Sequence, residues 1–456
     1  MLGGRSPRRR QDPPTPPPGL TPRHLPDAPG TGPEVATPAP APPRGRSVGS
    51  AADITRRGDA DAAAAGVAAP AAGADRPEQE ARPVRVAHVV ASLHPDEPEN
   101  GLVDLARAAP AAGMEMVVVA ISTATRSPVA AELHRLGVPV EDLGSAPWDP
   151  RAVSRAIEVL RRHRAEIVHT HIGNADVVGG AAGARLRLPV VSTLHRIESQ
   201  PADVGDRAKR AAKILARRRF VTRTIAISQL QRDWYAGAAA DLVVLPNGVT
   251  DPGPGDPAER QRLRDRLGAA PGTVLVASVA PMRRGKGQDL LLDAVAALPD
   301  SAPVVVVLGG DGPLRPWLEA RVDRDDELAA RIVFHPSPDR LPLLRAADVM
   351  VHATRNDAMP RALVEGLAAG VPAVASTSGG IPEIVTRDTG VLVPLEAGRI
   401  AEVVAELAAD PDRRERLGAA ARRRFLDRFE AGRWARELAA IYTGLLDARP
   451  GALTRR

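Results

Sequence analysis

The sequence predicts an α/β protein with two Rossmann-like, doubly wound parallel-sheet domains that face each other across a cleft, preceded by a disordered N-terminal tail. Short apolar runs alternate with helical patterns from Val84 onward, and such alternation is typical of parallel sheets covered by helices on both faces. About a dozen strands are more than one twisted open sheet usually contains. A stretch rich in Pro and Gly interrupts them near residues 247–260, which indicates a break between two domains.

The elements follow from these runs in order. We expect strands over residues 84–92, 116–122, 166–169, 190–194, 224–227 and 243–245, and then over 274–279, 304–308, 332–335, 349–352, 373–375 and 391–393. The first domain then spans residues 83–247 and the second spans 248–430. A last helix over residues 431–448 carries an apolar stripe with Trp434, Leu438 and Tyr442, and we expect it to pack back toward the N-terminal domain.

Residues 1–82 form the expected tail. They are rich in Pro, Ala and Arg and show no amphipathic period, so they cannot bury enough apolar surface to offset the entropy of ordering. We expect this segment to be disordered; an arm that docks a partner or tethers the chain to a membrane is the alternative.

Composition limits the classes of function. The chain has no Cys, which excludes disulfides and Cys-ligated zinc and favours the cytoplasm. The net charge of +6 comes from 61 basic and 55 acidic residues, and nearly all of the basic ones are Arg. The preference for Arg is interpreted as a bias in composition and not as a sign of a basic binding surface. We therefore expect no nucleic-acid partner. No apolar run approaches the roughly 20 residues of a membrane span.

The segment from Asp357 to Pro372 has the signals of a helix. Pro360 suits its first turn and Gly370 its C-terminal cap. The N-terminus of this helix would offer free amides to an anion or a hydroxyl. Glu365, inside the helix, could accept hydrogen bonds from both hydroxyls of a ribose; an ordinary solvated Glu is the alternative.

Three glycine-containing turns each follow an expected strand. Lys286 lies between glycines in the turn Arg283–Gly287, where positive charge, bare backbone and a helix N-terminus together favour phosphate binding; a solvated basic turn is the alternative. The turn Ser378–Glu383 would allow a ligand to approach the backbone closely. The turn Gly309–Leu314 is interpreted as a tight turn.

In the first domain, Asn100 and Gly101 would open a helix after the first strand, and three histidines end later strands. His169, His171 and His195 would therefore line the cleft. A metal site is conceivable, but no further ligand is spaced to complete it, so we favour contact with a ligand and expect no metal.

Five segments in order resemble the motifs of the retaining glycosyltransferases of family 4, which have the two-Rossmann GT-B architecture. They are Leu245–Val249, Lys286–Gly287, Gly310–Leu314, Asp357–Glu365 and Gly379–Glu383. The resemblance covers roughly residues 84–445. It implies a hexosyltransferase that moves a sugar from a nucleotide-diphosphate sugar to an acceptor hydroxyl with retention of configuration, by front-face attack and without a metal or other cofactor. The enzyme would act by orientation and by stabilising the diphosphate leaving group.

The resemblance also implies roles for single residues. Lys286 would hold the donor diphosphate, Glu365 would bind the ribose, and His195 matches the family's active-site His. The backbone amides of Ala358, Met359 and Pro360 would contact the donor sugar. On the acceptor side the resemblance places Asn100, Gly101, His171 and Asn174.

Two positions depart from the family pattern. Asp357 occupies the first position of the paired-acid motif, where the family usually has Glu. Pro281 stands where the family's phosphate-binding Arg usually lies, and we expect Arg283 to take its place. The expected catalytic set is therefore His195, Arg283, Lys286 and Asp357. These departures favour one alternative, a catalytically weak or inactive binding protein for nucleotide sugars. A sugar-nucleotide epimerase of the same fold is a separate alternative.

The acceptor is not identified by the sequence; a glycan, a lipid-linked sugar and a small molecule all remain candidates. One basic segment bears on it, because Arg and Lys side chains crowd an expected helix over Arg207–Arg219. This helix could contact an anionic membrane surface, which would place a cytoplasmic enzyme at the inner face of the membrane. A solvated basic face is the alternative.

Overall fold

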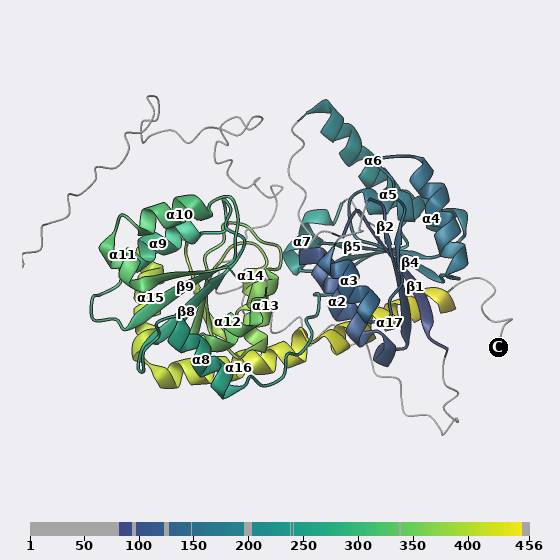
Figure 1. Ribbon diagram of the computed structural model, residues 1–456. Coiled ribbons are helices and arrows are strands. Elements are labelled where there is room, and N and C mark those ends of the chain that lie inside the picture. Colours follow the sequence, from purple (N-terminus) through teal and green to yellow (C-terminus); the bar gives the residue numbers. More distant parts are fainter. Residues whose placement is uncertain are drawn as a thin grey trace, which may run out of the picture. The chain divides into compact units, whose positions relative to one another are not determined.

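The protein contains two parallel sheets, each flanked by helices (Figure 1). A computed structural model describes residues 82–93, 97–122, 127–146, 148–195, 203–237, 239, 241–336 and 339–448, with the backbone alone at 97–100 and 204. The two-sheet, doubly wound class that the sequence predicts is confirmed. Residues 1–81 of the expected tail lie outside the described residues.

The first sheet has seven parallel strands in the order β3-β2-β1-β4-β5-β6-β7. Its strands are β1 (Val84–Val90), β2 (Met114–Ala120), β3 (Val140–Asp142), β4 (Ile167–Thr170), β5 (Val190–Leu194), β6 (Arg223–Ala226) and β7 (Leu242–Val244). The helical segments that connect them are α2 (Glu97–Ala108), η1 (Pro110–Ala112), α3 (Pro128–Arg135), α4 (Arg151–Arg162), α5 (Asn174–Arg185), α6 (Val204–Phe220) and α7 (Gln229–Tyr235).

The second sheet has six parallel strands in the order β10-β9-β8-β11-β12-β13. Its strands are β8 (Val274–Val279), β9 (Val304–Gly309), β10 (Ile332–His335), β11 (Val349–His352), β12 (Ala373–Ser376) and β13 (Gly390–Val393). Its helices are α8 (Pro257–Arg266), α9 (Gln288–Ala296), α10 (Arg315–Val322), α11 (Asp326–Arg331), α12 (Leu341–Ala346), α13 (Arg361–Ala368), α14 (Ile381–Ile384), α15 (Ala397–Ala409) and α16 (Pro411–Arg428). The last helix of the chain, α17 (Ala431–Asp447), packs beside the first sheet.

Every strand expected from the sequence is present, with ends that shift by at most two residues. The structure adds β3, which the sequence did not indicate. This strand is only three residues long and has no fully buried residue, so it lacks the apolar run by which buried parallel strands are recognised.

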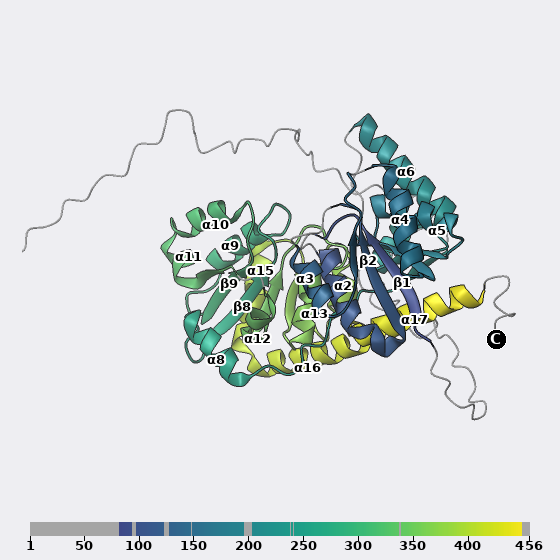
Figure 2. The same cartoon turned by 45° about the vertical axis from the view of Figure 1, so that its right-hand side comes forward.

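The last helix completes the core beside the first sheet. Trp434, Leu438 and Tyr442 of α17 are buried in one apolar cluster with Val86 of β1 and Leu105 of α2. Helix α17, yellow in Figures 1 and 2, lies against both elements. The domain limits at residues 247/248 and 430/431 stay a prediction.

Membrane crossing has a simple structural requirement. In the part of the chain that the structure describes, no helix combines the length and the apolar character needed to span a bilayer.

Candidate functional site

The strand order of each sheet reverses direction at one point, beside β1 in the first and beside β8 in the second. In open parallel sheets, ligands bind at the carboxyl ends of the strands that flank such a switch point. The second switch point lies between β8 and β11, which pair directly. The loops that follow these two strands carry Lys286 and Asp357, so the two motifs that the sequence singles out meet there.

Lys286 and Asp357 form an ion pair. The ammonium Nζ of Lys286 donates to Oδ2 of Asp357 at 2.6 Å, and each side chain is 11% exposed. An ammonium has three N–H groups, so Lys286 can keep this contact and still donate to a phosphate. Arg283, in the same loop, is exposed and makes no ion pair with any described residue.

His352 lies at the end of β11 beside this ion pair. Burial lowers the pKa of His352 to about 4, with Asp357 acting to raise it and Lys286 to lower it. Its Nε2 is buried and has no hydrogen-bond partner in the described chain. The imidazole is therefore neutral near pH 7 and adds no charge to the ion pair.

The turn that starts at Ser378 supports the Asp357 loop. Gly379 has a φ of 62°, and a Cβ there would lie 1.9 Å from the carbonyl oxygen of Asp357. The amide of Gly380 donates to that same oxygen at 2.9 Å. The close approach expected of these glycines is thus made to the backbone of Asp357 and Ala358 rather than to a ligand.

The turn after β9 supports the Lys286 loop in a similar way. The amide of Met282 donates to the carbonyl of Asp311 at 2.8 Å, and the amide of Leu314 donates to the carbonyl of Met282 at 2.9 Å. Gly312 has a φ of 152°, and a Cβ there would lie 2.5 Å from the Met282 carbonyl oxygen. This tight turn therefore fixes the backbone from which Arg283 and Lys286 project.

Helix α13 begins at Arg361, and Pro360 is its N-cap instead of a residue of its first turn. Pro360 has no N–H, so the sequence-based expectation that its amide contacts a sugar is wrong on chemical grounds. The amides of Ala358 and Met359 remain, and neither donates a hydrogen bond to any residue that the structure describes. Two free N–H groups thus lie next to the Lys286–Asp357 pair.

Glu365 is held between two arginines. Its Oε1 accepts from Nε of Arg361 at 2.7 Å and from Nη2 of Arg340 at 3.2 Å. Its Oε2 lies 3.0 Å from Nε of Arg340, but this contact lacks hydrogen-bond geometry, and the atom is buried without a partner among the described residues. One buried carboxylate oxygen is therefore left without a hydrogen bond, whereas the sequence suggested that the carboxylate serves both ribose hydroxyls.

The arginine beside Glu365 also joins the two sheets' helices. Arg361 of α13 forms an ion pair with Asp104 of α2, which also accepts from the amide of Thr250 at 3.0 Å. Burial acts to lower the pKa of Arg361, but Asp104 and Glu365 outweigh it and raise the pKa above its ordinary value. The guanidinium therefore carries a fixed positive charge between two carboxylates.

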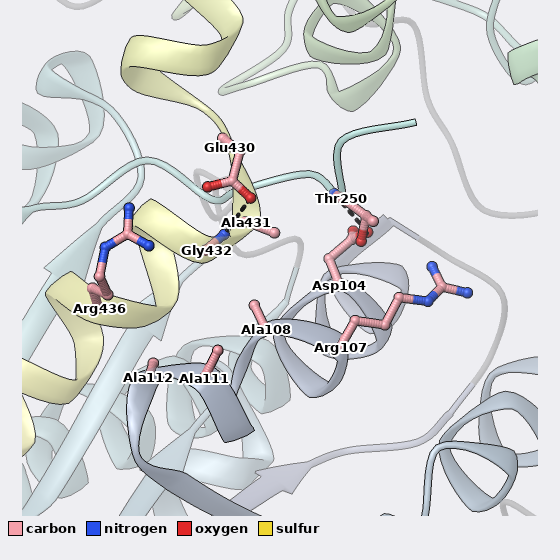
Figure 3. Close-up of a pocket in the computed structure, with 10 residues that line it drawn as sticks. All are labelled: Asp104, Arg107, Ala108, Ala111, Ala112, Thr250, Glu430, Ala431, Gly432 and Arg436. Carbon is pink, nitrogen blue, oxygen red and sulfur yellow. Dashed lines mark hydrogen bonds between the residues drawn. The ribbon is translucent and has the colours of Figure 1, made fainter. Parts of the chain in front are cut away.

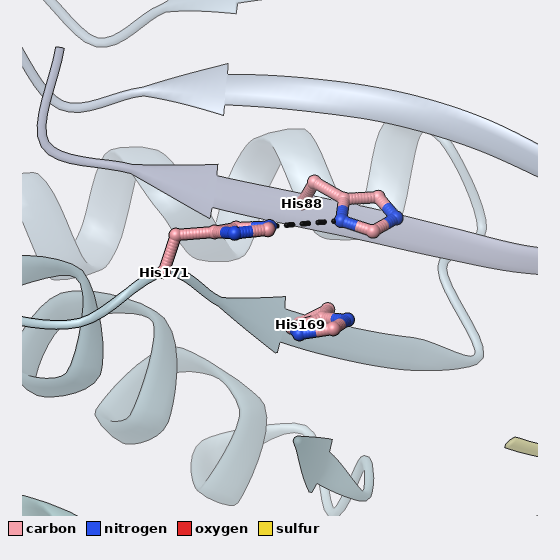
Figure 4. Close-up of side chains that lie close together, drawn as sticks. All are labelled: His88, His169 and His171. Atoms are coloured by element: carbon pink, nitrogen blue, oxygen red, sulfur yellow. Dashed lines mark hydrogen bonds between the residues drawn. The ribbon is translucent and has the colours of Figure 1, made fainter. Parts of the chain in front are cut away.

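At the switch point of the first sheet, four histidines pack together beside β1, β4 and β5. Nδ1 of His88 lies 3.0 Å from Nε2 of His171, and Nδ1 of His171 lies 2.8 Å from Nε2 of His195. Figure 4 shows His171 pointing at His88, with His169 beside them. Burial lowers the pKa of His171 to about 3, and burial together with His171 holds the pKa of His88 well below its ordinary range.

His169 does not line a cleft as the sequence suggested. It lies within β4 and is buried, because alternation along the strand turns its ring toward α17. Its Nδ1 hydrogen-bonds the hydroxyl of Tyr442, and its Nε2 lies 2.7 Å from Oγ1 of Thr193. His88, His169 and His171 are close enough to be considered as metal ligands. Since both nitrogens of His169 are already hydrogen-bonded, an ion would have to displace one of these partners.

The acceptor-side residues lie on two helices. Asn100 and Gly101 lie within α2, which begins at Glu97, so they do not open the helix as expected; the Asn100 side chain is outside the described residues. Asn174 is the first residue of α5, and its Oδ1 is buried without a partner in the described chain. Ile172, just before it, has a φ of 51°, which is unusual for a β-branched residue and indicates a strained turn.

A pocket of about 260 Å³ lies between α2 and the start of α17 (Figure 3). It is lined by Asp104, Arg107, Ala108, Ala111, Ala112, Thr250, Glu430, Ala431, Gly432 and Arg436. None of the site residues that the sequence predicts is among them, so this pocket is separate from the donor loops.

The basic helix α6 differs from its expectation at one residue. Arg217 does not face solvent, because it is buried against Asp176, with Nη2 to Oδ2 at 2.9 Å. Asp176 also accepts from Thr170 at 2.6 Å and Ser192 at 2.7 Å. Leu215 of α6 has an exposed fraction of 67%, and Arg218 and Arg219, three and four residues further on, are exposed on the same side of the helix.

Sequence reasoning missed His88, Asp104, Arg340 and Arg361. His88 contacts His171 and Arg340 contacts Glu365 from other elements. Arg361 contacts Glu365 from within the same helix, and Asp104 contacts Arg361. A signal was present for Arg361 alone, since a charged residue lies in an otherwise apolar part of the Asp357–Pro372 segment.

Two doubly wound parallel sheets, with polar and charged side chains gathered at both switch points, define the GT-B class of α/β proteins. The chain belongs to the group 1, family 4 glycosyltransferases. It matches "Glycosyl transferases group 1" over residues 259–424 and "Glycosyltransferase Family 4" over residues 98–251. It is accordingly a retaining hexosyltransferase that uses a nucleotide-sugar donor.

Individual relatives agree with this assignment. The chain is 30% identical over 361 residues to a D-inositol 3-phosphate glycosyltransferase of Xylanimonas cellulosilytica, covering 70% of this chain and 85% of that one. It is 36% identical over 219 residues to a GDP-mannose-dependent alpha-(1-6)-phosphatidylinositol monomannoside mannosyltransferase of Mycobacterium tuberculosis, covering 43% and 55%. Among solved structures, Anabaena HepE superposes with a TM-score of 0.70 at 22% identity, covering 79% of this chain and all of that one.

Proposed function

We propose that this transferase moves a hexosyl unit from a nucleoside-diphosphate hexose to a hydroxyl of a phosphorylated inositol. The observation that carries the donor half is the Lys286–Asp357 ion pair at the switch point, with the free amides of Ala358 and Met359 beside it. The acceptor half is supported by relatives whose names specify D-inositol 3-phosphate or phosphatidylinositol monomannoside. Both acceptors contain an inositol ring that bears a phosphate.

In this proposal the donor lies along the second sheet's switch point. Arg283 and Lys286 hold the diphosphate, and Oε2 of Glu365 accepts a ribose hydroxyl. Asp357 and the two free amides hold the hexose. Pro360 is not assigned a contact. On the acceptor side, Gly101 and Asn174 provide the surface that the inositol approaches, and His195 lies at the reacting face.

The reaction needs no nucleophile from the protein. The bond from the anomeric carbon to the phosphate oxygen breaks, and that oxygen leaves with the electron pair. The acceptor oxygen bonds to the anomeric carbon on the same face, and the acceptor proton passes to the leaving phosphate. Lys286 and Arg283 stabilise the charge that develops on the diphosphate, where fixed cations act most strongly on the rate.

Transfer assays test this proposal. We expect product with GDP-mannose or UDP-glucose as donor and with D-inositol 3-phosphate or phosphatidylinositol monomannoside as acceptor, and NMR of the product gives the anomeric configuration. Glu365→Gln should weaken donor binding by about tenfold or more, because a charge-assisted hydrogen bond is lost. Glu402→Gln, the same substitution at an exposed position of α15, is the control. Normal donor affinity in Glu365→Gln would remove Glu365 from the site.

We also propose that α6 binds an anionic membrane surface, which would bring the enzyme to lipid-linked acceptors at the cytoplasmic face. The support is the exposed Leu215 with Arg218 and Arg219 on the same side of α6, because an apolar side chain next to cations can enter the headgroup region. Arg218→Gln with Arg219→Gln should reduce sedimentation with anionic vesicles and leave neutral vesicles unchanged. Arg416→Gln with Arg423→Gln removes the same charge from α16 and is the control; equal losses in both pairs would contradict the proposal.

A further inference from the structure

Three imidazoles form a continuous hydrogen-bonded chain from the interior of the first sheet to its carboxyl edge. The chain runs from His88 on β1 through His171 to His195, with contacts of 3.0 Å and 2.8 Å. His88 and His171 are buried, whereas His195 is half-buried. We propose that His88 and His171 are positioning residues that fix the tautomer and the ring orientation of His195. This inference rests on the proposed function only for the place of His195 at the reacting face.

A neutral imidazole has one N–H and one lone pair, so the state of one ring sets the state of the next. Nδ2 of Asn247 lies 3.4 Å from Nδ1 of His195, and an amide nitrogen can only donate. Nδ1 of His195 is then an acceptor, and its proton lies on Nε2, from which it donates to Nδ1 of His171. By the same logic His171 donates from Nε2 to Nδ1 of His88.

The chain ends inside the protein. The His88 proton then lies on Nε2, an atom that is buried and has no partner in the described chain. An ending of this kind cannot pass a proton onward to solvent, so the chain does not serve as an exit path. Because burial keeps both His88 and His171 neutral, no added proton disturbs the order of donors and acceptors.

Packing fixes the planes of the same rings. The rings of His169 and His171 stack with centroids 4.7 Å apart and an interplanar angle of 9°, and those of His171 and His195 stack at 5.1 Å and 8°. The strained Ile172 follows His171 directly. His195 thus has Nε2 committed to His171 and Nδ1 accepting from Asn247, so its tautomer and ring orientation are set before a substrate binds.

The test uses the full chain without substrate. Ring-nitrogen NMR shifts of ¹⁵N-labelled protein report which nitrogen of His195 carries the proton. We expect the proton on Nε2 in the wild type, and a shift toward a mixture of tautomers in His88→Leu. His88→Asn keeps a polar group at the position of Nδ1 and should restore the wild-type shifts. A proton on Nδ1 of His195 in the wild type would overturn the proposal, whatever the variants do.

Kinetics give a second measurement. His88→Leu should lower kcat by about tenfold with little change in the donor KM, the effect of losing one net hydrogen bond. His88→Asn should recover most of that loss. Tyr442→Phe is the matched control, because it removes an equally buried hydrogen bond to His169 that lies off the chain. Equal effects of Tyr442→Phe and His88→Leu on the His195 shifts would reduce His88 to a general packing role.

The two proposals fail separately. A protein with the expected His195 tautomer and no transfer activity contradicts the proposed substrates and leaves the chain intact. An active enzyme whose His195 shifts ignore His88→Leu contradicts the chain and leaves the proposed function intact. Full kcat in His195→Ala would show that His195 takes no part in transfer, and the imidazole chain would then have no connection to the proposed function.

Discussion

Replacing Lys286 with Met should weaken the binding of a nucleoside diphosphate by about 10- to 150-fold. The ammonium lies 2.6 Å from Asp357, and both side chains are 11% exposed, so a phosphate that binds there replaces little water. A hydrogen bond to a charged group contributes about 1.5–3 kcal/mol, and each 1.4 kcal/mol corresponds to about a tenfold change in Kd. Met keeps the length of the side chain and removes only the charge and the donors.

The same ion pair predicts that a substitution of Asp357 has the opposite effect on nucleoside-diphosphate binding. Asp357→Asn removes the negative charge that offsets the ammonium of Lys286, so nucleoside-diphosphate binding should become tighter while hexosyl transfer slows. In the double variant most of the gain should vanish, because no ammonium is left for the carboxylate to offset. Calorimetry with a nucleoside diphosphate that lacks the sugar measures all three, with Lys209→Met as the control. A Kd within about twofold of wild type in Lys286→Met, or weaker binding in Asp357→Asn, would refute the reasoning.

Further predictions concern pH, a glycine and a buried ion pair. Burial lowers the pKa of His171 to about 3 and of His352 to about 4, whereas an unfolded His titrates near about 6.5. The unfolded chain therefore binds more protons, and the free energy of unfolding should fall by about 2 kcal/mol per histidine from pH 6.5 to 5; urea unfolding that is independent of pH would contradict this. Gly101→Ala has room for its Cβ, 3.9 Å from the Trp434 ring, and removes a helical glycine. The substitution should raise the free energy of unfolding by up to about 1 kcal/mol, and it should slow transfer if the acceptor approaches Gly101. Unchanged kinetics would show that the acceptor does not contact Gly101. Asp176→Asn leaves the buried Arg217 without a counter-charge and should cost about 3–5 kcal/mol, measured by denaturant unfolding, whereas a cost below about 1 kcal/mol would place the pair with exposed ones.

The fold could be predicted from the sequence because the buried parallel strands carry continuous apolar runs. β8, for example, is buried at all six positions, and its run ends where the Lys286 loop begins. The strand β3 was not predicted, because a short edge strand has no such apolar run. The position of Arg217 escaped for a related reason: a charged residue in a basic helix is expected to face solvent, and only the buried Asp176 across from it reverses that expectation.

The candidate site could be predicted in part. Lys286 and Asp357 were found because glycines and strand ends mark their loops, and their placement at adjacent strands followed once the strand order was known. The partners of Glu365 could be found only in part. Arg361 lies four residues earlier on the same helix, a spacing at which side chains meet, whereas Arg340 reaches Glu365 from the N-cap of α12. His88 was missed because it lies inside a strand, where a single His gives no local signal of its neighbours on β4.

The packing of α17 has a consequence for how the chain is made. Val86 leaves the ribosome more than 300 residues before Trp434, Leu438 and Tyr442, which complete the same apolar cluster. Until the final helix emerges, one flank of β1 and α2 stays uncovered, and His169 lacks its tyrosine partner. An uncovered apolar surface of this kind is prone to aggregate during synthesis. A chain that stops before residue 431 should therefore depend on chaperones, even though every strand of both sheets has already been translated.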